Sequence, residues 1–406
     1  MGFDAREVTP RVVRKATVLA AETRSFARAV IALREADIAI SAKTVERLVH
    51  DVGGEMAERR DMDPKRNAAL AQRPEEPPEL AVVECDGGRI RCRQPGHGPG
   101  VHLEGKGWRE DKNACLIRAQ RKTFDEDPQP EPPACFLDPK HVAEIAETEA
   151  LSVAAPLPQA PSAKEQAPDA TPPEPLVWQP KRLVRTVLSS LAEAKVFGMQ
   201  MAREARRRRF SEAVGKCFLG DGLPWNWSIW KRHFRSYTPI LDFIHVLSYL
   251  FLAARAVHGQ TRDAWDQYVV WMCGCWQGEV DQVLEELRAW ATKLGEPPQD
   301  AAENDPRRIV AKTIGYLANN RTRMKYPEYR KQGMPVTTAW MESLVKEINY
   351  RVKGTEMYWN DPDGAEAILQ VRAAALSDDD RLIRHLETRR GSPFTRRPSS
   401  SKPSLS

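Results

Sequence analysis

Three carboxylates, Asp86, Asp221 and Glu342, stand at positions from which a folded chain could present them to a common site. Asp86 lies in ELAVVECDGGRIRCRQ, which is predicted to be a hairpin-like β segment with Asp-Gly-Gly inside it. Asp221 follows the apolar strand pattern GKCFLG. Glu342 lies near the start of the predicted helix TTAWMESLVKEINYRVKG, beside its apolar stripe, with Thr337 or Thr338 as the expected cap.

Carboxylates from three separate elements suit one kind of chemistry. Phosphoryl transfer to DNA uses two divalent cations about 3.5–4 Å apart, one on the attacking oxygen and one on the leaving oxygen. Mg²⁺ prefers oxygen ligands and keeps several waters, so three carboxylates suffice to hold such a pair. The alternative is that Asp86 and Asp221 are turn residues, because Asp-Gly is strong turn chemistry. In that case Glu342 is only a charge that favours the helix dipole.

The elements that must position these acids follow from periodicity and composition. The first 60 residues have apolar positions at helical spacing and a predicted Ser41 cap, and AKTVERLVHDV resembles the second half of a helix-turn-helix. Residues 125–180 hold 13 of the 31 prolines, so we expect a largely disordered insert with one short helix at PKHVAEIAETEA. The predicted division is a helical, candidate DNA-binding domain at 1–60, a linker at 61–79, a first core segment at 80–124, the insert at 125–180, a second core segment at 181–245, a helical insertion at 246–335, a core helix and C-terminal helix at 336–376, and a basic tail at 377–406.

Composition limits the class of protein. The chain has 406 residues, of which 41% are hydrophobic, and it has no apolar run long enough to span a membrane. There is no signal-peptide pattern, and seven irregularly spaced cysteines suggest cytosolic thiols, so we expect a cytoplasmic protein. The net charge is only +5, but the basic residues cluster at 206–209, 319–331 and 389–398. Each cluster permits contact with nucleic acid, and each is equally explained as a solvated face or tail.

Six motifs in order make the chain similar to a bacterial insertion-sequence transposase of the DDE class, most of all to the ISKra-type group. They are VVECDGGRI, WREDKNACL, CFLGDGLPWNWSIWKRHF, ILDFIHVLSYL, NNRTRMKYPEYRKQGMPV and MESLVKEINYRVKGTEMYW. The resemblance implies an α/β fold with an RNase H-like mixed sheet flanked by helices, an all-helical insertion and an N-terminal helical domain. It implies that Asp86, Asp221 and Glu342 are the catalytic, metal-binding triad, with two Mg²⁺ ions for which Mn²⁺ can substitute.

Further residues gain candidate roles from the resemblance. Asp242-x-x-His245 repeats a pattern that follows the second catalytic acid in related families, so both are candidates for supporting the site, although a lone histidine is often only a core residue. Trp225, Trp227 and Trp230 suit base stacking, but core packing is favoured. Glu110 and Lys112 match the family pattern without an assigned role. The candidates for contacts with DNA phosphates are Arg321, Arg323, Lys325, Arg330 and Lys331.

The leading hypothesis is a transposase that cuts and joins phosphodiesters at the ends of its element. The expected partners are double-stranded DNA, both element ends and target, and further copies of the chain on that DNA; no membrane partner is expected. The expected location is the bacterial cytoplasm, at the nucleoid when bound to DNA. Two alternatives stay open: a non-catalytic DNA-binding protein derived from a transposase, and an RNase H-like metal nuclease without strand transfer. The residues TTAW before Met341, where relatives often have small residues, favour the first alternative.

Overall fold

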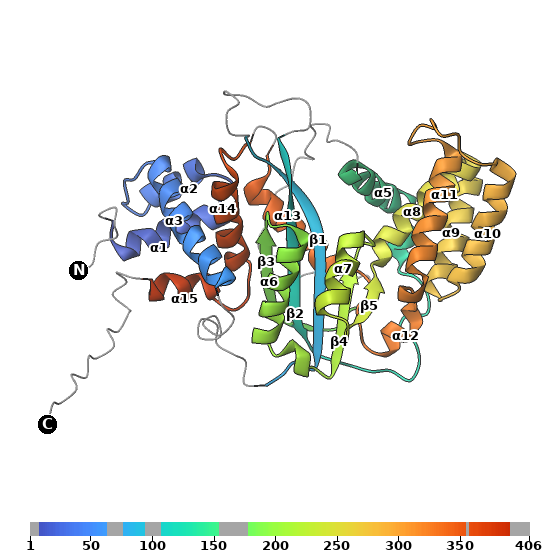
Figure 1. Cartoon of the computed structure of the whole chain (residues 1–406), viewed down its shortest axis with the longest axis horizontal. Coiled ribbons are helices and arrows are strands. Elements are labelled where there is room, and N and C mark those ends of the chain that lie inside the picture. Colours follow the sequence, from blue (N-terminus) through green and yellow to red (C-terminus); the bar gives the residue numbers. More distant parts are fainter. Residues whose placement is uncertain (1–7, 63–75, 94–106, 154–177, 355–356, 390–406) are drawn as a thin grey trace.

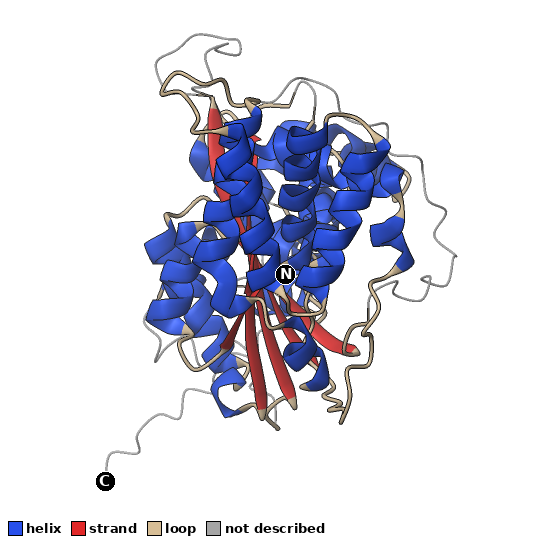
Figure 2. Ribbon diagram, turned by 90° about the vertical axis from the view of Figure 1, so that its right-hand side faces the viewer, coloured by secondary structure: helices blue, strands red, loops and turns tan. Residues whose placement is uncertain are grey.

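The fold is α/β, with a five-stranded mixed sheet flanked by helices (Figure 1). This computed structural model describes residues 8–62, 76–93, 107–153, 178–354 and 357–389. The predicted class, a mixed sheet with helices around it, is confirmed. Figure 2 shows the strands fanning out, as the natural twist of a sheet requires, with helices packed around them.

The sheet has the strand order β3-β2-β1-β4-β5. Its strands are β1 (Leu80–Arg91), β2 (Trp108–Ala119), β3 (Arg182–Ser190), β4 (Gly215–Gly220) and β5 (Thr238–Leu241). The first three strands form an antiparallel meander, while β4 and β5 run parallel to β1. As a result β1, β3, β4 and β5 all end at the same edge of the sheet. The predicted strand GKCFLG before Asp221 is confirmed as β4.

The predicted turn inside the first strand is wrong. β1 runs without a break through Asp86, Gly87 and Gly88, because β2 pairs with it along its whole length. The glycines serve close packing instead. A Cβ on Gly88 would lie 2.7 Å from a carboxylate oxygen of Asp111 on the neighbouring strand. The small residue is therefore needed where the two strands meet, without any reversal of the chain.

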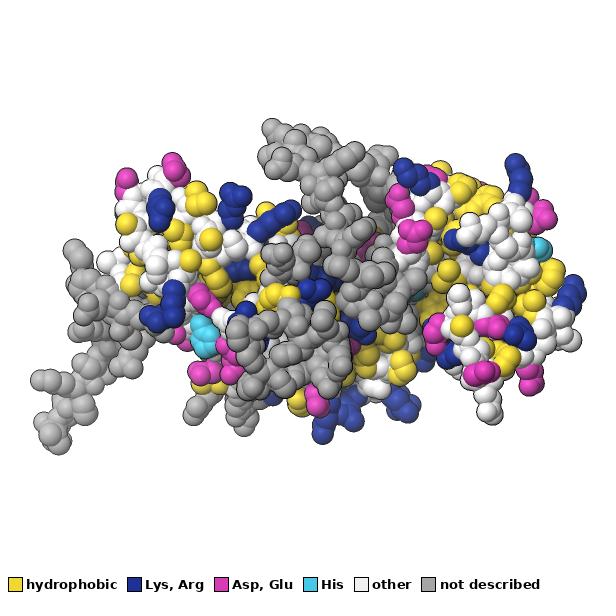
Figure 3. Space-filling view, turned by 90° about the horizontal axis from the view of Figure 1, so that it is seen from above, with side chains coloured by type: hydrophobic (Ala, Val, Ile, Leu, Met, Phe, Trp, Pro, Cys, Tyr) yellow, Lys and Arg dark blue, Asp and Glu magenta, His cyan; other side chains and the backbone are white. Residues whose placement is uncertain are grey.

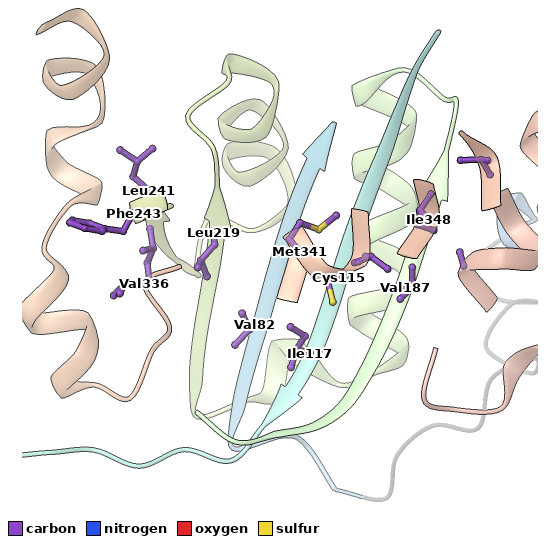
Figure 4. Packing of buried hydrophobic residues seen from close by; sticks show 14 of the residues in the cluster. Val82, Cys115, Ile117, Val187, Leu219, Leu241, Phe243, Val336, Met341 and Ile348 are labelled. Carbon is purple, nitrogen blue, oxygen red and sulfur yellow. The ribbon is translucent and has the colours of Figure 1, made fainter. Parts of the chain in front are cut away.

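The two faces of the sheet are covered by different helices. One face packs on α6 (Ala194–Arg207) and α7 (Pro224–His233), which contribute Phe197, Met201 and Ile229 to a core with Val83, Leu116 and Phe218. The other face packs on α13 (Ala339–Val352), whose Met341 and Ile348 meet Val82, Cys115, Val187 and Leu219 (Figure 4). Because strand side chains alternate, the even-numbered residues of β1 and the odd-numbered residues of β4 face α13.

A helical unit at one end of the sheet is built from helices of both the N-terminal and the C-terminal part of the chain. It contains α1 (Pro10–Glu22), α2 (Phe26–Arg34), α3 (Ala42–Asp61), α14 (Pro362–Ala375) and α15 (Arg381–Thr388). The Ser41 cap is confirmed, since its side chain accepts from the Thr44 amide. Gly53 and Gly54 do not end α3: the helix continues to Asp61, and Gly53 lets it lie directly on the backbone of Ala367 in α14.

The predicted basic tail at 377–406 also needs correction. Residues 381–388 form α15, whose Leu382 and Leu386 are buried, because its amphipathic pattern lets it pack on α1 and α14. Residues 390–406 lie outside the described part of the chain.

A second helical unit at the other end follows β5. It consists of α8 (Phe243–His258), α9 (Arg262–Trp276), α10 (Val280–Leu294), α11 (Pro306–Asn320) and α12 (Tyr326–Lys331). α8 ends at Gly259, whose φ of 72° is a conformation that glycine adopts readily. The predicted helical insertion at 246–335 therefore matches an observed unit that begins three residues earlier.

The prediction of a largely disordered insert at 125–180 is wrong for its described first part. The short helix exists as α5 (Pro139–Val153), and it packs on α8. Phe136, Val142 and Ala146 are buried, and the short 3-10 helix η1 (Ala134–Leu137) leads into α5. A few apolar anchors thus order a proline-rich segment that lacks a continuous periodic pattern. Residues 154–177 of the predicted insert lie outside the described residues.

None of the helices within the described ranges is both long and apolar enough to cross a membrane.

Candidate active site

Asp86 and Asp221 occupy neighbouring positions on parallel strands. The register pairs Cys85 of β1 with Gly220 of β4, and each aspartate is the next residue. Adjacent strands lie about 4.8 Å apart, so the two backbones are side by side at this edge. Because strand side chains alternate between the two faces, both residues fall on the α13 face, to which Val82 and Leu219 also belong. The strands therefore deliver both carboxylates to one end and one face of the sheet.

Asp221 is both a strand end and a turn residue. Its Oδ1 accepts the Leu223 amide at 2.9 Å and also the side-chain amide of Asn226, which closes the turn into α7. Gly222 has a φ of 100°, which favours glycine, and Tyr316 of α11 donates its hydroxyl to the Asp221 carbonyl at 2.7 Å. The two interpretations of Asp-Gly are thus compatible here, since the turn itself fixes the carboxylate at the strand end.

Glu342 lies half-buried in the first turn of α13. The apolar residues that hold this turn against the sheet are Met341 and Leu344. The helix begins at Ala339, as predicted to within two residues, but neither threonine caps it with a side chain: Thr338 makes no such bond and Thr337 Oγ1 is buried without a partner. The threonine-cap prediction is wrong because another residue holds this end of the helix.

That residue is Asp242, which is fully buried at the end of β5. Its Oδ1 accepts the Thr338 amide at 2.8 Å, and its Oδ2 lies 2.6 Å from Nδ1 of His245. A second link runs between the backbones, because the Phe243 amide donates to the Val336 carbonyl. Asp242, paired with His245, therefore fixes the start of α13 against the sheet.

Sequence reasoning missed a fourth carboxylate, Glu84. It lies two residues before Asp86 on β1, so both fall on the same face of the sheet. Its side chain is fully buried, and neither of its oxygens makes a hydrogen bond of acceptable geometry. Burial raises the pKa of Glu84 well above its usual value, and the nearby carboxylates of Asp242 and Glu342 raise it further; the Met341 amide is close enough to oppose the rise. The available signal was a glutamate inside the apolar run LAVVEC, two residues before Asp86.

The electrostatic couplings put these acids in one neighbourhood. The negative charges of Asp242 and Glu342 both raise the pKa of Glu84. Burial raises the pKa of the Cys85 thiol, and the charges of Asp221 and Asp86 raise it further. Among the described residues, however, no group of three or more His, Cys, Asp or Glu side chains is arranged to hold a metal ion. The structure brings Asp86 next to Asp221 and places Glu342 on the covering helix; their convergence around metal ions stays a prediction.

The predicted phosphate contacts divide into two kinds. Lys325 and Lys331 are exposed, and Arg321 is exposed with an ion pair to Asp281 at 3.1 Å. Arg323 is half-buried, with its guanidinium 4.2 Å from the ring centroid of Trp227. These four side chains border the α7 and α11–α12 region on the protein surface.

Arg330 is the exception, and its prediction as a DNA contact is wrong. It is fully buried, stacks on Trp276 at 4.1 Å, and donates from Nε to Asp127 at 2.8 Å. Its Nη2 also donates to the Trp276 carbonyl at 3.0 Å. The side chain is buried because it neutralises Asp127 and ties the segment after β2 to α9 and α12.

Two other groups that the sequence singled out have structural roles. Lys112 is buried and forms an ion pair with Glu110 at 2.8 Å, and its ammonium lies 5.7 Å from the Trp225 ring centroid. Trp225, Trp227 and Trp230 pack partly buried against the core under α7, as favoured. Trp230 Nε1 donates to the Tyr237 carbonyl at 2.8 Å.

Comparison with known proteins adds no family to these observations. No protein-family model matches the chain, and no curated protein matches it significantly.

Proposed function

We propose that this chain is a metal-dependent DNA transposase of the DDE class with an RNase H-like core. The observation that carries the proposal is the placement of Asp86 and Asp221 at adjacent ends of parallel strands, on the face that the Glu342 helix covers. If the two aspartates were only turn residues, nothing would require them to lie at the same edge and on the same face of the sheet, under one covering helix.

The topology supports the same proposal. The resemblance leads us to expect a mixed sheet flanked by helices, and the antiparallel β1–β2–β3 meander with β4 and β5 parallel to β1 is a mixed sheet. The helical unit from α8 to α12 lies between the second aspartate and the glutamate, where the resemblance puts an insertion. Fold resemblance by itself does not establish chemistry, so the proposal rests on the acids.

The chemistry of the donors fits Mg²⁺, which prefers carboxylate oxygens and keeps several waters. Asp86, Asp221 and Glu342 would hold the ions, and bound Mg²⁺ would supply charge stabilisation to the attacking and leaving oxygens. The role of the chain is positioning. β1 and β4 fix the two aspartates through their shared register, and Asp242 fixes the start of α13 by accepting the Thr338 amide.

Substrate binding would use cations outside the acidic edge. Arg321, Arg323, Lys325 and Lys331 are available for contacts with phosphates, which position DNA without reading its sequence. The proposed partners are double-stranded DNA at element ends and target, and other copies of the chain assembled on it. The helices of 1–60 are the proposed reader of the element ends.

The test is a cleavage and joining assay with the full chain. The substrate is a labelled duplex that carries the inverted repeats flanking the gene, supplied with Mg²⁺ or Mn²⁺ and a target plasmid. Asp86→Asn, Asp221→Asn and Glu342→Gln should each abolish cleavage and joining, whereas Glu328→Gln, an exposed glutamate of α12, should leave both unchanged.

The alternatives give different results in the same assay. Cleavage without joined product would identify a nuclease, and binding without cleavage would identify a non-catalytic DNA-binding protein. Full activity in any one of the three triad variants would remove that residue from the proposed site.

A further inference from the structure

The surface formed by the last turns of α6 and α7 is strongly basic. The chain has no acidic residue from 222 to 241, a stretch that includes the whole of α7. The exposed cations of this surface are Arg206, Lys231, Arg232 and Arg235, which we call the α6–α7 basic surface. Viewed from above, Lys and Arg side chains gather at the edge of the molecule on the side of α7 (Figure 3).

The two helices form one surface because they pack closely. A Cβ on Gly198 of α6 would lie 3.0 Å from Ile229 and 3.1 Å from the His233 ring of α7. The pKa of His233 is lowered by burial and then by the positive charges of Arg232 and Arg206, one from each helix. The end of α7 therefore packs on α6, and Arg206 and Arg232 both lie near the His233 ring.

The structure divides the arginine run at 206–209 into two groups. Arg207 and Arg208 pair with the buried Glu204, and Arg209 pairs with Glu212 at 2.6 Å. Arg206 belongs to the other group. Like Lys231, Arg232 and Arg235, it forms no ion pair with any residue in the described ranges. Four exposed positive charges thus stay uncompensated on one surface.

This surface lies away from the acidic edge in two respects. It is on the α6–α7 face of the sheet, whereas Asp86 and Glu84 have the parity of the α13 face. It also lies at the edge where β1 and β4 begin, because both helices run back from the edge where these strands end. The stretch of β1 from Leu80 to Asp86 spans on the order of 20 Å, so one phosphate cannot contact both places.

We propose that the α6–α7 basic surface binds the phosphate backbone of duplex DNA, at a stretch separate from the phosphodiester that is cut. The proposal rests on the proposed function for the identity of that DNA as substrate. A duplex is favoured over a single strand because single strands are held by exposed aromatic rings. The tryptophans of α7 pack against the core instead, and the Trp230 N–H is already bonded to Tyr237.

A purely structural explanation also exists for these cations. Positive side chains in the last turn of a helix interact favourably with its dipole, and α7 has three basic residues there. That explanation predicts a change in thermal stability and no change in DNA affinity when the charges are removed, so the two are separable by experiment.

The test compares two triple variants of the full chain that lose the same charge. The first is Lys231→Gln/Arg232→Gln/Arg235→Gln. The control is Arg288→Gln/Lys293→Gln/Lys312→Gln, which removes exposed cations of α10 and α11. The probe is a fluorescein-labelled random-sequence duplex of about 30 base pairs, followed by anisotropy over a range of KCl concentrations, because phosphate contacts release counterions.

We expect the first variant to bind about tenfold or more weakly at moderate salt, with a log K against log [salt] slope smaller by about 2 to 3, and the control to match the wild type. Equal loss in both variants would show an effect of net charge alone and overturn the assignment. Unchanged binding in both would do the same. Circular dichroism checks folding, and the single variant Arg232→Gln, with a slope change of about 1, provides the test if the triple variant unfolds.

Other polyanions give the remaining outcomes. A larger loss for single-stranded RNA of equal length, or for phosphatidylserine vesicles, than for duplex DNA would overturn the choice of a duplex. Failure of the proposed function would give a different result. The wild type and Asp86→Asn would then behave alike in the cleavage assay, whereas the anisotropy difference between the two triple variants would remain.

Discussion

Two fully buried glutamates, Glu84 and Glu204, have opposite electrostatic surroundings in two regions of this protein. Glu204 on α6 faces Arg207, Arg208 and Arg381, which outweigh the effect of burial and lower its pKa to about 2. Glu84 on β1 makes no hydrogen bond of good geometry; burial raises its pKa well above the usual value, and the carboxylates of Asp242 and Glu342 raise it further against the opposing Met341 amide.

The difference separates a structural ion cluster from a candidate site. The Glu204 cluster is satisfied within the protein and joins α6 to α15 through Arg381, which donates to Glu204 at 2.7 Å. At the acidic edge, by contrast, Glu84 is buried close to the carboxylates of Asp242 and Glu342, and its pKa is raised. A strongly raised pKa beside other acids is typical of functional sites, which agrees with the proposed function.

Removal of Glu204 should have the largest effect. Glu204→Leu would leave three arginines without their shared carboxylate, which breaks a buried ion cluster, so we expect a loss of about 3–5 kcal/mol in the free energy of unfolding. Urea denaturation at neutral pH measures this loss. Glu212→Gln, which removes a more exposed ion pair with Arg209, is the control and should cost about 1 kcal/mol or less. Similar losses for the two variants would contradict the comparison.

Arg330 should behave like the Glu204 cluster, although the sequence placed it among the DNA contacts. Arg330→Met leaves Asp127 with a partly buried charge and no cation, and we expect a loss of about 3 kcal/mol or more in unfolding free energy. Lys331→Met, at the next and exposed position, should change stability by less than about 0.5 kcal/mol. Denaturation of both variants decides the matter, and a stable Arg330→Met protein with weakened DNA binding would restore the earlier assignment.

Acid should act through Glu204 in a defined direction. Its folded pKa of about 2 lies below the usual 4.5, so the stabilisation is present above pH 4.5 and is lost as the pH falls towards 2. The expected loss is about 3 kcal/mol, since each pKa unit corresponds to about 1.4 kcal/mol. The measurement is the difference between wild type and Glu204→Gln in urea denaturation at several pH values. A constant difference between pH 5 and pH 2.5 would count against the lowered pKa.

Glu84 should give the smallest change, and one of opposite sign. Glu84→Gln keeps the volume and removes a buried carboxylate without partners, so unfolding free energy in EDTA-containing buffer should rise by about 1 kcal/mol rather than fall. The measurement is urea denaturation of Glu84→Gln and Glu204→Gln under the same conditions, which compares their changes in unfolding free energy. A loss of several kcal/mol on Glu84→Gln would show that the carboxylate has a stabilising partner, and the contrast between the two glutamates would be lost.

Much of the local structure follows from the sequence alone. The apolar runs at 182–190 and 215–220 are strands, Gly259 ends α8, and Ser41 caps α3, because these features depend on neighbouring residues. The positions of Asp86, Asp221 and Glu342 in two strands and a helix could be predicted for the same reason. Only the tertiary structure could show that the strand register sets the two aspartates side by side.

Other features were decided by contacts between residues far apart in the chain. Asp-Gly-Gly at 86–88 is a turn pattern locally, yet it continues β1 because β2 pairs with every residue of it. The start of α13 is held by Asp242, 96 residues away from Thr338, in place of a threonine cap. Arg330 is buried because Asp127 lies 203 residues earlier in the chain. Sequence periodicity reports which side chains an element buries, but charge partners and strand register are set when distant segments meet, so only the folded chain determines them.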